Sequence, residues 1–161
     1  MGSGKTTLGR LLAARLHGDF HDVDDCIEAA EGRSIRQLIE MAGEPAFRDL
    51  ELQMLRRLRR ALSPRAVVAT GGGIVETPAT HAVLQSFDTV VWLRADPRRC
   101  VERLGDQRQA RPLLDAPQTW EARWLLRQPL YERLAQVVVS TDDVGEQESL
   151  DQLVQSLEAL S

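Results

Sequence analysis

The chain opens with a glycine-rich stretch, Met1 to Thr7, whose residues match the second half of a phosphate-binding P-loop. In this motif the glycines let successive backbone N–H groups curl around phosphate oxygens, and the helix that follows adds the positive end of its dipole. Lys5 supplies a charge for the β and γ phosphates of a nucleotide, and Thr6 supplies a hydroxyl for magnesium. The stretch therefore predicts a nucleotide-binding loop that follows a strand and opens a helix.

Two features favour this interpretation over a flexible terminus rich in glycine and serine. The leucines that follow the loop have helical spacing, at Leu8, Leu11, Leu12 and Leu16. Lys5 is also the only lysine among the 20 basic residues. A phosphate loop needs a compact positive charge at this position, which the wide planar guanidinium of arginine would not supply.

Composition narrows the class of protein. With 161 residues, 43% of them hydrophobic, the chain is long enough for one domain and too short to make two the better expectation. A net charge of −4 argues against a protein that binds nucleic acid or a membrane surface, so local arginines must hold any anionic ligand. No apolar run is long enough to span a bilayer, and Cys26 and Cys100 are typical of reduced thiols in a cytoplasmic protein. The three histidines lack metal-ligand spacing, which favours surface or structural roles for them.

Two carboxylates follow the first predicted helix. Residues 19–24 are typical of a short strand that ends in Asp22 and Asp24, and the alternation of a strand would place both side chains on one side, facing a ligand crevice. In that position Asp22 would contact magnesium through water and Asp24 would contact a substrate hydroxyl. The alternative is an acidic loop that caps the next helix.

The rest of the chain alternates helices with short apolar strands. Helices are predicted at about 34–41, with a stop at Gly43, and at about 45–62, from 77 on, 96–104 and 119–127, the last of these continuing to about 136. A final helix is predicted to carry Leu150, Leu153, Leu157 and Leu160. Strands are predicted within 65–70, 89–95 and 137–141. This order predicts an α/β fold with a doubly wound parallel sheet, whose ligands lie at the carboxyl ends of the strands.

Two further segments fall at such strand ends. Gly71, Gly72 and Gly73 remove the side chains there, so that a ligand could contact the backbone, although a flexible turn would have the same composition. Residues 105–118 form a polar stretch with prolines, and a loop of this length predicts a mobile lid. The P-loop stretch, the two aspartates, the three glycines and the predicted lid together favour an enzyme that catalyses phosphoryl transfer.

These motifs resemble shikimate kinase, a family of P-loop enzymes that transfer the γ-phosphate of ATP to the 3-hydroxyl of shikimate in the chorismate route to aromatic amino acids. The resemblance covers essentially the whole chain. It rests on Gly-Ser-Gly-Lys-Thr-Thr at 2–7, Asp-Val-Asp at 22–24 with Ile27-Glu28, Gly-Arg-Ser-Ile at 32–35, Gly43-Glu44 with Phe47-Arg48 and Glu51, the three glycines at 71–73, Arg-Pro-Leu-Leu at 111–114, and Arg127 with Pro-Leu-Tyr at 129–131.

The resemblance implies a role for each matching residue on the nucleotide side. The ATP-binding set is Gly2, Ser3, Gly4, Lys5, Thr6, Thr7, Arg103 near the adenine, and Arg111 in the lid. Mg²⁺ would be held by Thr6 and, through water, by Asp22. Lys5, Arg111 and Asp24 would be the catalytic residues.

On the acceptor side the resemblance implies that Asp24 binds the shikimate hydroxyls and could receive the proton. Arg48 and Arg127 would clamp the substrate carboxylate, and Gly72 and Gly73 would present their backbone to the ring. The substrate-binding region would be about residues 28–62. The implied partners are ATP and shikimate, with no nucleic acid and no membrane, and the enzyme would be a monomer.

The chain departs from the family at two places. Residues 141–147 are acidic and lack the arginine and proline that the family often places beside the adenine. Family members also carry an apolar strand and the first P-loop glycine before the position of Met1, and this central strand is absent here. We therefore expect that Met1 is a miscalled start or an artificial boundary, and that the native protein continues roughly ten residues upstream.

Two other functions stay open at this point. The first is another small P-loop kinase, acting on gluconate or a nucleotide, although the set of Asp24, Arg48, Arg127 and three glycines speaks against it. The second is a non-catalytic nucleotide-binding or interaction module, which the shortened loop makes plausible.

The missing strand leads to a prediction. Each large apolar side chain buried by a central strand contributes about 1.5 to 3 kcal/mol, against a total domain stability of about 5 to 15 kcal/mol. The 161-residue chain should therefore fold poorly or be inactive, whereas a version extended upstream should recover both properties. Thermal melts followed by circular dichroism and assays of ADP release check this, and a cooperative melt with normal turnover of the short chain would contradict it.

Overall fold

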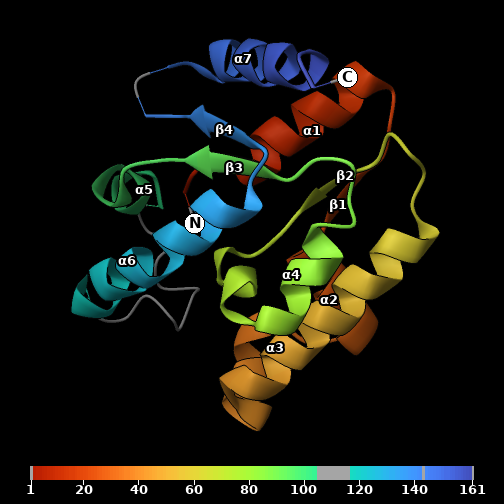
Figure 1. Ribbon diagram of the computed structural model, residues 1–161. Helices are drawn as coiled ribbons and strands as arrows, with labels where there is room; N and C mark the ends of the chain where they lie inside the picture. The colour runs from red at the N-terminus through yellow and green to blue at the C-terminus, as the bar shows by residue number, and fades with distance from the viewer. Residues whose placement is uncertain (1, 105–116, 143, 161) are drawn as a thin grey trace.

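The computed structural model describes residues 2–104, 117–142 and 144–160, and helices alternate with short strands along them (Figure 1). The strands are β1 (Phe20–Asp22), β2 (Val67–Ala69), β3 (Val91–Arg94) and β4 (Val137–Ser140). The helices are α1 (Lys5–Leu16), α2 (Val23–Glu31), α3 (Ile35–Ala61), the short 3₁₀ helix η1 (Gly72–Glu76), α4 (Pro78–Leu84), α5 (Pro97–Leu104), α6 (Pro117–Leu134) and α7 (Glu146–Glu158). The predicted α/β class is confirmed.

The strands form two parallel pairs. β1 pairs with β2, with Phe20 opposite Val67, and β3 pairs with β4, with Val91 opposite Val137. The two pairs are not hydrogen-bonded to each other, and within the described ranges no strand lies between β2 and β3. The parallel direction agrees with the sequence prediction.

Two hydrophobic cores cover opposite faces of the strands. On one face α7 packs on β4 and α1 packs on β1 and β2, and this core contains Leu8, Leu12, Val139 and Leu150. On the other face α2, α3 and α4 lie below the strands in the view of Figure 1, and α6 lies to their left, below β3. Their core is larger and consists of Val23, Ile27, Phe47, Leu55, Leu58, Ile74, Val75, Leu84 and Leu134.

The strand predicted over residues 19–24 is shorter than expected, and this changes the position of one aspartate. β1 ends at Asp22, whose side chain accepts a hydrogen bond from the backbone N–H of Asp24 and so caps α2. Asp24 therefore lies in the first turn of a helix, and the argument from strand alternation was wrong for it. Asp22 does cap the following helix, as the alternative interpretation had it.

Two predicted helix boundaries also differ. The helices expected at 34–41 and 45–62 form one element, α3, which is kinked at Gly43 (φ 82°, ψ 165°). A positive φ of this kind favours glycine, which explains the predicted stop. The helix after residue 119 is continuous, because Pro129 lies inside α6 rather than interrupting it. Of the predicted lid, residues 105–116 lie outside the described residues.

The histidine prediction can be tested at His81, which is half-buried. Its Nε2 lies 2.7 Å from the carbonyl oxygen of Val75, and its Nδ1 lies 3.2 Å from the Arg133 guanidinium. Since a guanidinium can only donate, Nδ1 accepts and Nε2 donates, so both ring nitrogens are satisfied and the structural role is confirmed here. Among the described helices, none is long and apolar enough to cross a membrane.

Leu55 offers a direct test of the larger core. Its side chain is 0% exposed, so Leu55→Ala should lower the free energy of unfolding by about 2 to 5 kcal/mol through lost burial and a residual cavity. Leu160→Ala makes the same chemical change at a side chain that is 56% exposed, and should cost less than about 0.5 kcal/mol. Urea unfolding of both variants checks the difference, and equal effects would show that this core is misplaced.

Candidate active site

The P-loop stretch adopts a conformation that requires its glycines. Gly2 and Gly4 have positive φ angles of 74° and 85°, and Gly4 is the N-cap residue of α1. A Cβ atom on Gly2 would collide with the carbonyl oxygen of Cys100, so only glycine fits there. Ser3 is buried, and its Oγ lies 3.5 Å from the Nζ of Lys5. The loop and the helix start that the sequence predicted are therefore both present.

Arg103, in the last turn of α5, and Thr141, which follows β4, support this loop. The guanidinium of Arg103 donates to the carbonyl oxygen of Gly2 at 3.4 Å and to that of Thr141 at 2.5 Å. The hydroxyl of Thr141 donates to the carbonyl oxygen of Ser3 at 3.3 Å. Arg103 thus lies beside the phosphate loop and next to the segment 141–147, while its predicted contact with adenine stays a prediction.

Thr6 and Asp22, the two residues expected at the metal, are in contact. The Thr6 hydroxyl donates to Oδ2 of Asp22 at 3.3 Å, and Oδ1 of Asp22 accepts the capping hydrogen bond from Asp24 at 3.1 Å. A hydroxyl and a carboxylate beside a phosphate loop are the oxygen ligands that Mg²⁺ uses when substrate phosphates complete its coordination. The donor set therefore fits the ion.

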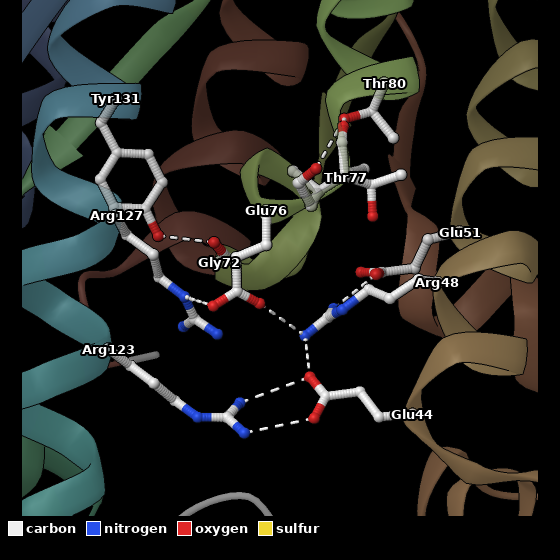
Figure 2. A network of polar contacts seen from close by, with 11 residues as sticks. Glu44, Arg48, Glu51, Gly72, Glu76, Thr77, Thr80, Arg123, Arg127 and Tyr131 are labelled. Atoms are coloured by element: carbon white, nitrogen blue, oxygen red, sulfur yellow. Dashed lines mark hydrogen bonds and ion pairs between the residues drawn. The ribbon is translucent and has the colours of Figure 1, made fainter.

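Arg48 and Arg127 meet at a single carboxylate, that of Glu76 (Figure 2). Arg48 comes from α3 and donates to Oε2 of Glu76 at 3.1 Å, and Arg127 comes from α6 and donates to Oε1 at 3.0 Å. The side chains of the two arginines are only 12% and 16% exposed. The two residues expected to clamp a carboxylate are thus brought together around one.

Two more carboxylates hold the guanidinium of Arg48. Glu44 accepts from it at 2.6 Å and Glu51 at 2.5 Å. Burial by itself would lower the pKa of Arg48, but its hydrogen bonds and charge attraction with Glu51 and Glu44 raise it, so the guanidinium stays charged. The Glu51 side chain is 1% exposed, and burial raises its pKa despite the bond from Arg48, with Asp24 adding like-charge repulsion.

The three glycines make room for side chains of the site. A Cβ on Gly73 would overlap the Arg48 guanidinium, and one on Gly72 would lie 3.0 Å from the Tyr131 hydroxyl, which donates to the Gly72 carbonyl at 2.6 Å. A Cβ on Gly71 would lie 3.0 Å from Oε1 of Glu51. The absence of side chains at 71–73 therefore has a steric cause in the protein itself, and contact of a ligand with this backbone stays a prediction.

Half of the predicted site residues line one cavity of about 620 Å³. It brings Lys5 and Ser3 of the loop into the same space as the acceptor-side residues Asp24, Arg48, Gly72, Gly73 and Arg127. Thr6, Asp22 and Arg103 do not line this cavity but lie at the loop beside it. Arg111, the predicted lid arginine, lies outside the described residues.

Two residues that the sequence analysis did not single out belong to this site. Glu76 follows the third glycine by three positions, and Arg123 stands one helical turn before Arg127, on the same side of α6. Arg123 donates to both oxygens of Glu44, at 3.4 and 3.2 Å. The spacing of Arg123 was a usable signal, whereas nothing local marks Glu76, because its partners are distant in the sequence.

The ion pairs of Glu44 predict how stability depends on pH. Burial would raise the pKa of this carboxyl, but the hydrogen bonds from Arg123 and Arg48 outweigh it and lower the pKa. The stabilisation is therefore present above the ordinary carboxyl pKa and is lost as the pH falls through the lowered folded-state pKa.

Glu44→Gln should thus lower the free energy of unfolding by about 1 to 2 kcal/mol at about pH 7, and the difference from the parent should shrink towards about pH 3. The matched control is Glu40→Gln, in an exposed pair with Arg36, which should cost less than about 1 kcal/mol. Urea unfolding at both pH values measures this, and a difference that does not depend on pH would contradict it.

The sequence of the chain is similar to those of known proteins, which bear on the function of this site. Residues 1–158 match the family model described as shikimate kinase. The shikimate kinase of Chromohalobacter salexigens is 38% identical to the chain over 164 residues, covering 100% of the chain and 89% of that protein. The shikimate kinase of Enterococcus faecalis is 36% identical over 160 residues, covering 98% of the chain and 94% of that protein.

Solved structures agree with the sequence relatives. The shikimate kinase from Acinetobacter baumannii in complex with shikimate superposes with a TM-score of 0.92 at 30% identity, over 99% of this chain and 89% of that one. The enzyme from Aquifex aeolicus gives a TM-score of 0.85 at 32% identity, over 99% of this chain and 92% of that one. The P-loop and the paired arginines agree with the family model and with these relatives, and the chain belongs to the shikimate kinase family.

Proposed function

We propose that this chain transfers the γ-phosphate of ATP to the 3-hydroxyl of shikimate. The observation that carries the proposal is that one cavity is lined both by the lysine of a phosphate loop and by two arginines that converge on a carboxylate. Shikimate combines a carboxylate with ring hydroxyls, so it suits a site that holds the acid at one end and a phosphoryl group at the other. Membership of the family supports the same reaction.

On the phosphate side, the chain provides positive charge and oriented N–H groups. Lys5 and the backbone N–H groups of residues 2–7 would hold the β and γ phosphates, and the N-terminus of α1 adds its dipole. Thr6 and Asp22 would hold Mg²⁺, which neutralises charge on the phosphates when it is bound. Because phosphoryl transfer passes through a loose transition state, positioning and charge stabilisation account for most of the catalysis.

On the acceptor side, the proposal assigns orientation to Arg48 and Arg127, whose planar forks bind a carboxylate in a defined plane. Asp24 lines the same cavity and would position the reacting hydroxyl and take up its proton. The backbone of Gly72 and Gly73 would support the ring. The region of about residues 28–62 supplies Arg48 together with Glu44 and Glu51, which hold it in place.

The remaining parts of the proposal rest on the resemblance. Arg111 would close over both substrates from the lid, which would also exclude water as a competing acceptor. Arg103 would lie near the adenine, for which its place beside the P-loop offers support. We also propose a monomeric, cytoplasmic enzyme. The net charge of −4 and the two free cysteines support this proposal.

The decisive experiment is ADP release with ATP and Mg²⁺, measured with and without shikimate. Shikimate-dependent release, absent with gluconate or a nucleoside monophosphate, supports the proposal. Release that depends on gluconate or the nucleotide would instead assign another small-molecule kinase, and ATP binding without any acceptor-dependent release would assign a non-catalytic module. The family comparisons do not favour either alternative.

Arg127 provides a sharper prediction within the same assay. Arg127→Ala removes a hydrogen bond between charged groups that is worth about 1.5 to 3 kcal/mol, so the KM for shikimate should rise by roughly 10- to 100-fold. The KM for ATP should change by less than about twofold, since the nucleotide is held at the other end of the cavity. Arg60→Ala, at an exposed position of α3, is the control. A rise in both KM values would contradict the assignment.

A further inference from the structure

Glu76 lies where the two substrate-binding arginines converge. Each of its carboxylate oxygens accepts from a different arginine, Oε2 from Arg48 at 3.1 Å and Oε1 from Arg127 at 3.0 Å (Figure 2). This is the arrangement that the carboxylate of a bound ligand would have between the same two guanidinium groups. The protein therefore already places a carboxylate of its own between the two arginines.

We propose that Glu76 is an internal substitute for the substrate carboxylate, which holds Arg48 and Arg127 in the resting state and is displaced when substrate binds. The inference deepens the proposed function and rests on it, because it takes Arg48 and Arg127 as the residues that bind the shikimate carboxylate. It makes Glu76 a residue that sets affinity and specificity rather than a catalytic one.

Charge repulsion is the reason for displacement. If Glu76 stayed in place, an incoming carboxylate would lie next to a like charge in a partly buried site, which is unfavourable. Arg48 would remain paired after the exchange, because Glu44 and Glu51 also accept from it. The exchange therefore replaces one carboxylate by another and leaves no guanidinium without a counter-charge.

Of the three carboxylates around Arg48, the position of Glu76 makes it the one able to leave. Glu51, on α3, is only 1% exposed, and Glu44 is held by Arg123 as well as by Arg48. Glu76 is 29% exposed and is the last residue of the short helix η1, so its side chain can turn towards solvent. No other charged partner of Glu76 is found in the described part of the chain.

The arrangement also has a consequence for specificity. A ligand that carries a carboxylate can replace the charge of Glu76, whereas a neutral ligand of the same shape would have to leave Glu76 in place or leave Arg127 uncompensated. The internal carboxylate would thus be displaced by a charged ligand and remain in place beside a neutral one, so that its displacement would limit the affinity for charged ligands only. It would also keep Arg48 and Arg127 close together without mutual repulsion before substrate arrives.

The test is Glu76→Gln, which keeps the size of the side chain and removes its charge. If Glu76 competes with substrate, the variant should bind shikimate roughly three- to tenfold more tightly, because the competing resting state is weakened. The KM for shikimate should fall accordingly, while kcat and the KM for ATP change by less than about twofold. Calorimetry and steady-state assays measure both, on the form of the chain that melts cooperatively.

Three controls make the result specific. Glu132→Gln makes the same change at an exposed glutamate that is hydrogen-bonded only to Gln128 in the described structure, and should leave shikimate affinity unchanged. Glu76→Ala should shift affinity in the same direction as Glu76→Gln. The methyl ester of shikimate, which lacks the charge, should bind weakly to the parent, and its affinity should not gain from Glu76→Gln.

The outcomes separate this inference from the proposed function. If the form of the chain that melts cooperatively shows no shikimate-dependent ADP release, the proposed function fails, whatever the variants do. If the parent turns shikimate over but Glu76→Gln binds it equally or more weakly, Glu76 positions the arginines and the displacement model is wrong. An equal gain for shikimate and its methyl ester would also overturn the model, since the effect would then be independent of the substrate charge.

Discussion

The side chain of Arg48 is only 12% exposed, and the need to compensate its buried charge determines the arrangement of much of this site. A buried charge is tolerated only when it is paired and hydrogen-bonded, and Arg48 meets that condition through three carboxylates. Glu44 and Glu51 stand at positions four before and three after it, so one face of α3 carries all three groups. The kink at Gly43 precedes Glu44 directly, and the missing Cβ of Gly73 leaves space for the guanidinium.

The same network links segments that are far apart in the chain. Glu76 joins α3 to α6 through Arg48 and Arg127, and Glu44 joins the same two helices through Arg123. Beside the cavity, Arg103 and Thr141 hold the phosphate loop by the carbonyl oxygens of Gly2 and Ser3. Charged groups of α3, α6 and η1 therefore orient the acceptor side, while strand ends and the N-terminus of α1 orient the phosphate side.

The sequence predicted the parts of this structure that depend on local chemistry. The helix start near residue 34, the interruption at Gly43 and the strand within 137–141 follow from capping hydrogen bonds, φ preference and a run of β-branched valines. Local reasoning was wrong at Asp24, because its backbone N–H donates a capping hydrogen bond to Asp22 and a helix begins where alternation suggested a strand. It also missed Glu76, whose partners lie 28 and 51 positions away.

By itself, then, the sequence determined the α/β class, the phosphate loop with its single lysine, and the glycines that backbone geometry requires, because each depends on neighbours within a few residues. Only the tertiary structure decided which carboxylates meet which arginines, that the two strand pairs remain separate, and that the glycines at 71–73 make room for side chains of the protein itself. The physical reason is that charge pairing and steric exclusion act through space. Residues remote in sequence therefore become partners only once α3, η1 and α6 have packed around the same cavity.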